Sequence, residues 1–266
     1  MRAIFLKELK LSRKGLLIWS SIMFGLAAFG GIEFIALKDS LDVLVIAIDG
    51  FSPIIRIVFG INVVPLNTVE GIYICMHHWY SLVAYAFSVY LGVFLIAKDE
   101  YFKTAEFLYT KPYKRSTILI SKIWVGIVNQ AILVIVMVIT TIIFILYPLD
   151  AIYLSSRIIL MAIGMFLSQL VFFTIGMFCA SFLKNYATAL RYSFATLITF
   201  YVIAFSIEYF GMNVSSYDFL SPVRYFYAPF VINDGIRWIY LILTGVIASI
   251  GSWSTLFVYK KRDIYV

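Results

Sequence analysis

Six long apolar runs, separated by shorter polar stretches, dominate the pattern of the chain. Each run has about 20 residues or more, the length that an α-helix needs to cross the hydrocarbon core of a bilayer. The runs are continuous and do not alternate apolar and polar residues over ten-residue segments, as the strands of membrane β-barrels do. We therefore predict an all-α membrane protein in which residues 1–266 form a single transmembrane domain. The expected spans lie at about 15–37, 73–97, 118–147, 157–183, 187–210 and 236–259.

Two further apolar stretches, 38–72 and 211–235, are broken by charges and prolines. The interrupting residues are Asp39, Asp42, Asp49, Pro53, Arg56 and Pro65 in the first stretch and Asp218, Pro222, Arg224, Pro229 and Asp234 in the second. An Asp or Arg at the bilayer centre costs at least about 2.5 kcal/mol on insertion scales, so several in one segment cancel the gain from its leucines and isoleucines. We therefore expect short amphipathic helices at the outer surface. A seventh crossing at 43–64 is the alternative for the first stretch.

Composition supports a membrane protein and excludes a soluble globular domain. Hydrophobic residues make up 63% of the chain and charged residues 13%, against about 45–50% and about 25% in soluble domains. The net charge of +7 does not indicate a nucleic-acid partner, because the basic residues stand at the ends of apolar runs and form no patch between aromatics on a polar surface. Cys75 and Cys179 lie inside apolar runs, and we expect them to be small buried residues.

The distribution of basic residues predicts the orientation of the chain. Segments 1–14, 98–122, 184–191 and 260–266 carry 16 of the 21 Lys and Arg residues. Because Lys and Arg concentrate in cytoplasmic loops, we expect these segments, and with them both termini, to lie in the cytoplasm. The protein is then a multi-pass protein of the cell (plasma) membrane. A seventh span at 43–64 would place the basic residues of 98–122 outside, which argues against that alternative.

Residues 1–14 combine apolar positions with five basic residues. Phe5, Leu6 and Leu9 lie near one face of a helix, and the basic residues surround the rest. We expect an amphipathic elbow helix in the membrane interface, with its basic side toward the anionic headgroups of membrane lipids. A frayed basic tail is the alternative.

The stretch 98–122 reads KDEYFKTAEFLYTKPYKRSTILISK and is the longest segment expected on the cytoplasmic side. Thr104 is suited to cap a short helix with Glu106 in its first turn, and Pro112 ends that helix. An apolar ridge is formed by Phe107, Leu108 and Tyr109. Such an amphipathic helix suits docking into the groove of a soluble partner, and a solvated loop helix without a partner is the alternative.

The same stretch resembles the segment between the second and third spans of type-2 ABC transporter permeases, the transmembrane subunits of type V exporters. That family carries there an acidic pair, then Gly-Thr-x-Glu, a short apolar run, a proline and a basic residue. The matching residues here are Asp99, Thr104, Glu106, Phe107, Leu108, Pro112 and Arg115. Lys103 departs from the pattern, since the family usually has glycine at that position. Before the last span, Leu220-Ser221-Pro222 and Arg224-Tyr225-Phe226 also fit the family.

The resemblance implies the permease subunit of an ATP-driven ABC exporter. Two permease subunits, identical or related, would form the transmembrane dimer, and each would dock a separate ABC ATP-binding subunit through the seven matching residues. The chain contains no G-x-x-x-x-G-K-[ST] motif, which cradles phosphates in ATPases. We therefore expect no enzymatic activity and no cofactor in this chain, with ATP and Mg bound by the partner subunit.

The expected cargo of such an exporter is amphipathic or hydrophobic: a peptide, an antibiotic or a lipid-like compound leaving the cytoplasm. A permease that extrudes sodium or another cation is one alternative. A partner-free secondary transporter is another, from a different class. Substrate identity does not follow from the sequence.

Four titratable residues near the outer ends of spans are candidates for an outer gate or a substrate contact, namely Glu33, His77, His78 and Glu208. Ionisable residues in membrane spans are often functional, but side chains close to the interface also reach water. Because adjacent residues point to different helix faces, His77 and His78 are not expected to line one narrow site. An intramembrane enzyme that uses both histidines is a further alternative, but metal-ligand spacing is absent and we expect no metal site.

Overall fold

The structure is a computed structural model of the chain, and it describes residues 2–37, 40–61, 64–103, 114–183, 185–211 and 214–261. Within these ranges the regular structure is helical and contains no strand. The predicted all-α fold is therefore confirmed.

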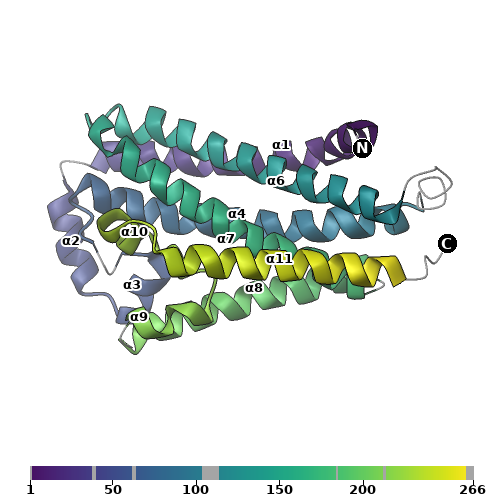
Figure 1. Cartoon of the computed structure of the whole chain (residues 1–266). Coiled ribbons are helices and arrows are strands. Elements are labelled where there is room, and N and C mark those ends of the chain that lie inside the picture. Colours follow the sequence, from purple (N-terminus) through teal and green to yellow (C-terminus); the bar gives the residue numbers. More distant parts are fainter. Residues whose placement is uncertain are drawn as a thin grey trace.

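Six long helices run side by side and form the body of the molecule (Figure 1). Each is long and apolar enough to cross a membrane, which confirms the six expected spans. They are α1 (Arg2–Leu37), α4 (Val69–Tyr101), α6 (Arg115–Thr141), α7 (Ser155–Phe182), α8 (Tyr186–Tyr209) and α11 (Trp238–Lys261). A π-helical turn, η2 (Ile142–Leu146), extends α6, and a 3-10 turn, η3 (Ile152–Leu154), leads into α7.

The first helix is longer than the first expected span. Residues 2–14 are helical and continue into the span without a break, so the expected elbow segment and the first span are one helix. An orientation of its first turns along the membrane surface stays a prediction.

Short helices gather at one end of the bundle, here called the short-helix end (Figure 1). They are α2 (Leu41–Asp49), α3 (Pro53–Phe59), α9 (Val214–Tyr217), η4 (Asp218–Leu220) and α10 (Ala228–Asp234). Pro53 begins α3 at a first-turn position, where its missing N–H costs no helical hydrogen bond. The alternative crossing at 43–64 is wrong, because α2 ends within that range and a turn separates it from α3.

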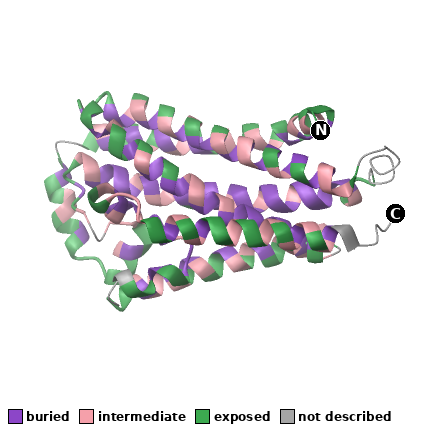
Figure 2. Cartoon of the chain, viewed as in Figure 1, coloured by how far each residue is buried: buried purple, intermediate pink, exposed green. Residues whose placement is uncertain are grey.

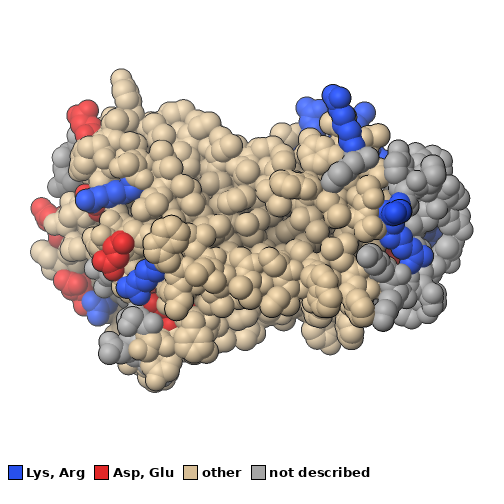
Figure 3. Space-filling model, viewed as in Figure 1, with Lys and Arg blue, Asp and Glu red and all other residues tan. Residues whose placement is uncertain are grey.

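The opposite end of the bundle holds the start of α1, the end of α4, the start of α6 and the end of α11 (Figure 1). We call it the basic end. In Figure 3 the visible Lys and Arg side chains gather strongly there, whereas the visible Asp and Glu gather at the short-helix end together with some basic residues. The start of α1 and the end of α11 thus lie on the same side of the bundle, as an even number of spans requires.

Helices α4 and α7 form the centre of the bundle (Figure 2). In the most apolar 18-residue stretch of each helix, 72% of the residues are buried in α4 and 61% in α7, against 11% in α11. The two central helices touch through their backbones: a Cβ atom on Gly92 would lie 2.3 Å from the carbonyl oxygen of Phe173, and one on Gly176 would lie 2.5 Å from that of Val89. Glycine is required at both positions, because any side chain would push the helices apart.

Candidate functional site

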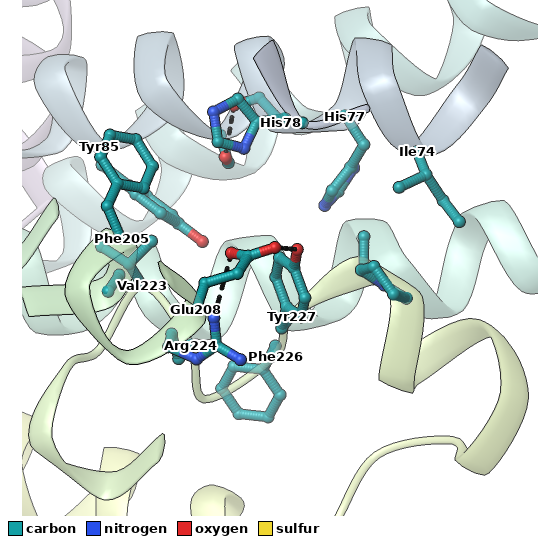
Figure 4. Close-up of a pocket in the computed structure, with 15 residues that line it drawn as sticks. Ile74, His77, His78, Tyr85, Phe205, Glu208, Val223, Arg224, Phe226 and Tyr227 are labelled. Atoms are coloured by element: carbon teal, nitrogen blue, oxygen red, sulfur yellow. Dashed lines mark hydrogen bonds and ion pairs between the residues drawn. The ribbon is translucent and has the colours of Figure 1, made fainter. Parts of the chain in front are cut away.

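Arg224 organises a buried charged cluster at the short-helix end. Its Nε donates a hydrogen bond to Asp218 Oδ1 at 2.6 Å, and its Nη1 donates to Glu208 Oε2 at 3.2 Å. Tyr227 Oη donates to the other oxygen of Glu208 at 2.7 Å, and the guanidinium lies over the Tyr227 ring, 4.6 Å from its centroid. Figure 4 shows these contacts between Glu208, Arg224 and Tyr227. Because an unpaired buried charge is costly, the cluster fixes the end of α8 to the segment between η4 and α10.

The environment of this cluster affects its titration. Burial raises the pKa of Asp218, and the Arg224 guanidinium opposes that shift. Burial also raises the pKa of Tyr227 well above its usual value, and the nearby Glu208 carboxylate adds to the effect. The Tyr227 phenol therefore stays protonated at physiological pH and keeps its hydrogen bond to Glu208.

A small cavity separates the Arg224 cluster from α4 (Figure 4). Its volume is about 30 Å³, which leaves room for about one or two water molecules. His77 and His78 both line it, so the expectation that they would not share a site is wrong. Adjacent helical residues point about 100° apart around the helix axis. The cavity borders a sector of α4 at least that wide, at the place where α8 and the turn before α10 meet this helix.

The two histidines nevertheless make different contacts. The His78 ring stacks on Phe205 of α8, with ring centroids 5.9 Å apart. His77 Nδ1 lies 3.4 Å from Tyr73 Oη, one turn earlier on α4. Glu208 lines the same cavity, whereas Glu33 is exposed on α1 and does not line it. Three of the four candidate gate residues are thus brought together, and the fourth lies apart.

The chemistry available at this cavity is limited. Among the residues that the structure describes, no group of three or more His, Cys, Asp or Glu residues is placed to hold a metal ion. The two carboxylates near the cavity already accept hydrogen bonds from Arg224 and Tyr227. With both carboxylates engaged, the geometry suits a structural or gating contact where α8 and the turn before α10 meet α4.

A second buried charged group lies at the basic end and joins α1 to α4. The Lys98 ammonium donates a hydrogen bond to the Glu8 carboxylate. Glu8 is 0% exposed and Lys98 is 3% exposed. Lys98 also lies over the Phe94 ring, 5.3 Å from its centroid. Pairing is what makes these two charges tolerable inside the bundle.

The next residue along α4 extends this group to α6. Lys122 Nζ donates to Asp99 Oδ2 at 2.5 Å, and Lys122 is fully buried. We call Glu8, Lys98, Asp99 and Lys122 the basic-end charge network. Its two acids and two bases balance, and it links three helices at the point where the chain leaves α4 and enters α6.

Uncharged polar residues continue these links toward the middle of the bundle. Asn129 Nδ2 on α6 donates to Ser12 Oγ on α1 at 2.9 Å. Ser88 Oγ on α4 donates to Gln130 Oε1 on α6 at 3.2 Å. Hydrogen bonds of this kind between apolar helices stabilise one packing arrangement over its neighbours.

The described part of the chain has six spans, short helices at one end and a buried charge network at the other, and a known family covers nearly all of the sequence. A family model described as "ABC-2 family transporter protein" matches residues 3–239. The chain belongs to the ABC-2 transporter family. No curated protein matches it. Membership confirms the resemblance to type-2 ABC transporter permeases: the chain is a membrane permease component, not itself catalytic, of a transporter that works with an ATP-binding partner.

Two of the seven coupling residues expected for an ABC-2 permease lie in the described part of the chain. Asp99 stands near the end of α4 and is held by Lys122. Arg115 is the first residue of α6. The other five, Thr104, Glu106, Phe107, Leu108 and Pro112, lie outside the described residues. The coupling helix therefore stays a prediction, with its two flanks placed at the basic end.

Lys103 has a left-handed backbone, with φ of 55°. This is the position at which the ABC-2 permeases that the chain resembles usually carry glycine. Glycine adopts positive φ at no steric cost, whereas a side chain strains it. A left-handed backbone at this position is a physical reason to place glycine there, and this chain adopts it with lysine.

Sequence reasoning missed the partners that matter most at the basic end. Lys98 was expected to begin the cytoplasmic stretch, Lys122 was expected near the start of the third span, and neither was assigned a buried partner; Glu8 was not singled out. One signal was available: Glu8 is the only acidic residue of 1–14, and it shares one helix face with the buried Ile4 and Ser12. An acid on the buried face of a basic helix indicates a buried basic partner.

Proposed function

We propose that this ABC-2 permease is the transmembrane subunit of an exporter that moves an amphipathic or hydrophobic molecule out of the cytoplasm. A separate ATP-binding subunit docks at the basic end and supplies the energy of ATP hydrolysis. A second permease subunit, identical or related, completes the pathway. The observation that carries the proposal is the basic-end charge network, which couples three spans beside the expected docking segment.

The orientation follows from charge. Lys and Arg gather at the basic end (Figure 3), and such residues concentrate on the cytoplasmic side of membrane proteins. Both termini then lie in the cytoplasm, and the Arg224 cluster lies at the outer surface. This is the orientation in which a cytoplasmic ATPase reaches the 104–113 segment.

The charge network suits transmission of force from that segment. The 104–113 stretch connects the end of α4 to the start of α6, and Asp99 and Lys122 tie those two helices together. Lys98 and Glu8 tie the same end of α4 to α1. A displacement of the segment would therefore move three spans together, because breaking either buried pair costs several kcal/mol.

The peripheral helices leave apolar surface for a second subunit and for lipid. In the most apolar windows of α1 and α8 only 28% of the residues are buried, and in α11 only 11%. These faces are too apolar to contact water. They support a proposed assembly in which a second permease packs against part of this surface.

The cation-extruding alternative finds less support. The buried carboxylates at the short-helix end, Asp218 and Glu208, both accept from Arg224. A guanidinium in that position competes with any cation for the same oxygens. The proposal therefore keeps an amphipathic or hydrophobic cargo.

Charge reversal in the docking segment tests the proposal. The permease is co-expressed with the ATP-binding subunit, and the complex is purified through a tag on the permease. Glu106→Lys and Arg115→Glu should each reduce recovery of the ATPase subunit, or leave it bound with an ATPase rate that the permease no longer alters. Asp49→Asn, at the short-helix end, serves as the control. An intact, normally regulated complex with both reversals would contradict the docking assignment.

A further inference from the structure

A groove between α1 and α4 opens at the basic end. Its volume is about 710 Å³, within the range of about 300–1,000 Å³ that is usual for ligand sites. Lys7, Lys10 and Lys14 of α1 line it at one end. Leu11, Ile18, Tyr90 and Phe94 continue it along the bundle.

The three lysines make the mouth of the groove strongly positive. Their spacing of three and four residues places them on one face of α1. None of them forms a salt bridge with a residue that the structure describes. Lys98 and Asp99, which also border the groove, are paired with Glu8 and Lys122. Lys7 also lies near enough to Asp99 to interact with that carboxylate, so the charges of Lys10 and Lys14 in particular are available to an anion.

The deeper wall of the groove is apolar. The Tyr90 and Phe94 rings stack with centroids 5.8 Å apart, and Ile18 on the facing helix is 62% exposed. Gly15 keeps the space beside Tyr90 open, because a Cβ there would already touch that ring at 3.5 Å. From Lys7 to Ile18 the helix rises about 16 Å at 1.5 Å per residue. That is about half of the 30 Å hydrocarbon thickness, or one leaflet.

We propose that this groove binds one anionic phospholipid from the leaflet at the basic end. The phosphate lies against Lys7, Lys10 and Lys14, and an acyl chain follows Ile18 and the stacked Tyr90 and Phe94 rings. A second copy of the chain fits the groove less well. A second copy would have the same orientation in the membrane, so its lysines would lie at the same membrane depth as those of the first copy. The two sets of positive charges would repel each other. The proposal does not depend on the direction of transport or on the cargo.

Lipid exchange measured by native mass spectrometry tests the site. The full-length protein is purified, exchanged into phosphatidylcholine and titrated with phosphatidylglycerol of the same acyl chains. The wild type should retain one phosphatidylglycerol in preference to phosphatidylcholine. Lys7→Gln/Lys14→Gln should weaken that binding roughly 10- to 30-fold, from the usual contribution of a lysine near an anionic membrane surface.

Two matched variants separate a built site from diffuse attraction. Arg2→Gln/Arg13→Gln removes the same number of charges from α1, but these exposed residues do not line the groove, so it should bind as the wild type does. Gly15→Leu keeps every charge and fills the groove beside Tyr90, so it should lose the lipid. Thermal unfolding without added lipid shows whether each variant is folded.

Three results would overturn the proposal. The first is an equal loss of binding in the lysine and the arginine double variants, which would show that the lipid is attracted by the overall charge of α1 and not by the groove. The second is wild-type binding by a folded Gly15→Leu variant. The third is a disulfide between two chains carrying Ile18→Cys, with Cys75 and Cys179 replaced by serine, because it would assign the groove to a second copy.

Discussion

The Lys98 ammonium donates a hydrogen bond to the Glu8 carboxylate across 90 positions of sequence, in the interior of the bundle. This contact binds the N-terminal helix to the central span. Neither side chain is exposed enough to reach water when the other is removed.

Glu8→Gln should destabilise the protein by about 3–5 kcal/mol, because it leaves the Lys98 ammonium buried without its counter-charge. Thermal or denaturant unfolding of the purified protein measures the loss. The double variant Glu8→Gln/Lys98→Met should recover most of the stability, since it removes both charges. A double variant as unstable as Glu8→Gln alone would show that the pair is not the source of the effect.

Gly92→Ala should destabilise the bundle by about 1–3 kcal/mol, the usual cost of overpacking a tight interface. The new Cβ would meet the backbone of α7, which cannot turn away as a side chain does. Gly245→Ala on α11 is the matched control, because open space surrounds that position. We expect the control to be neutral or slightly stabilising by helix propensity. Similar midpoints for the two variants in thermal unfolding would contradict the close α4–α7 contact.

Lys103→Gly should stabilise the protein by about 0.5–1 kcal/mol, because glycine adopts the left-handed backbone without strain. Asp150 has a similar φ of 50°, but Asp tolerates this region better than Lys. Asp150→Gly should therefore gain less. Unfolding midpoints of the two variants make the comparison, and a loss of stability in Lys103→Gly would contradict the left-handed turn.

Arg224→Met should destabilise the short-helix end, and the loss should be larger at pH 8 than at pH 5. Without the guanidinium, burial and the Glu208 carboxylate both raise the pKa of Asp218, and Arg237 is left to oppose them. A raised folded-state pKa means that the folded protein binds more protons than the unfolded chain, so stability falls as pH rises through that pKa. Unfolding at both pH values checks the sign. An equal loss at pH 5 and pH 8 would contradict the proposed role of Asp218.

The spans and the short helices could be predicted because hydropathy is a local property. Charges and prolines within 38–72 were enough to exclude a crossing, and the structure has α2 and α3 there. The ends of the spans shifted by a few residues, as at α4, which begins at Val69 and ends at Tyr101. Helix ends depend on caps such as the Thr68 side chain, which accepts from the Gly71 N–H, and hydropathy does not register them.

The buried pairs could not be predicted, because they depend on how distant helices pack. Lys98 and Asp99 looked like the start of a cytoplasmic loop, and only the approach of α1 and α6 buries them. At the short-helix end, Glu208 was named as a candidate, but Arg224, Asp218 and Tyr227 were not recognised as its neighbours. Likewise, His77 and His78 border one cavity because α8 and the turn before α10 both approach this part of α4, and the sequence does not reveal that approach.

The central claim is that the basic-end charge network transmits the work of an ATP-binding subunit to the spans. The most direct test is the ATPase rate of the assembled complex in lipid nanodiscs, compared with that of the ATP-binding subunit alone. With Glu8→Gln/Lys98→Met, we predict a folded complex that retains its ATP-binding subunit but whose ATPase rate matches the isolated subunit, whereas the wild-type permease alters that rate. A double variant that regulates ATP hydrolysis as the wild type does would contradict the claim.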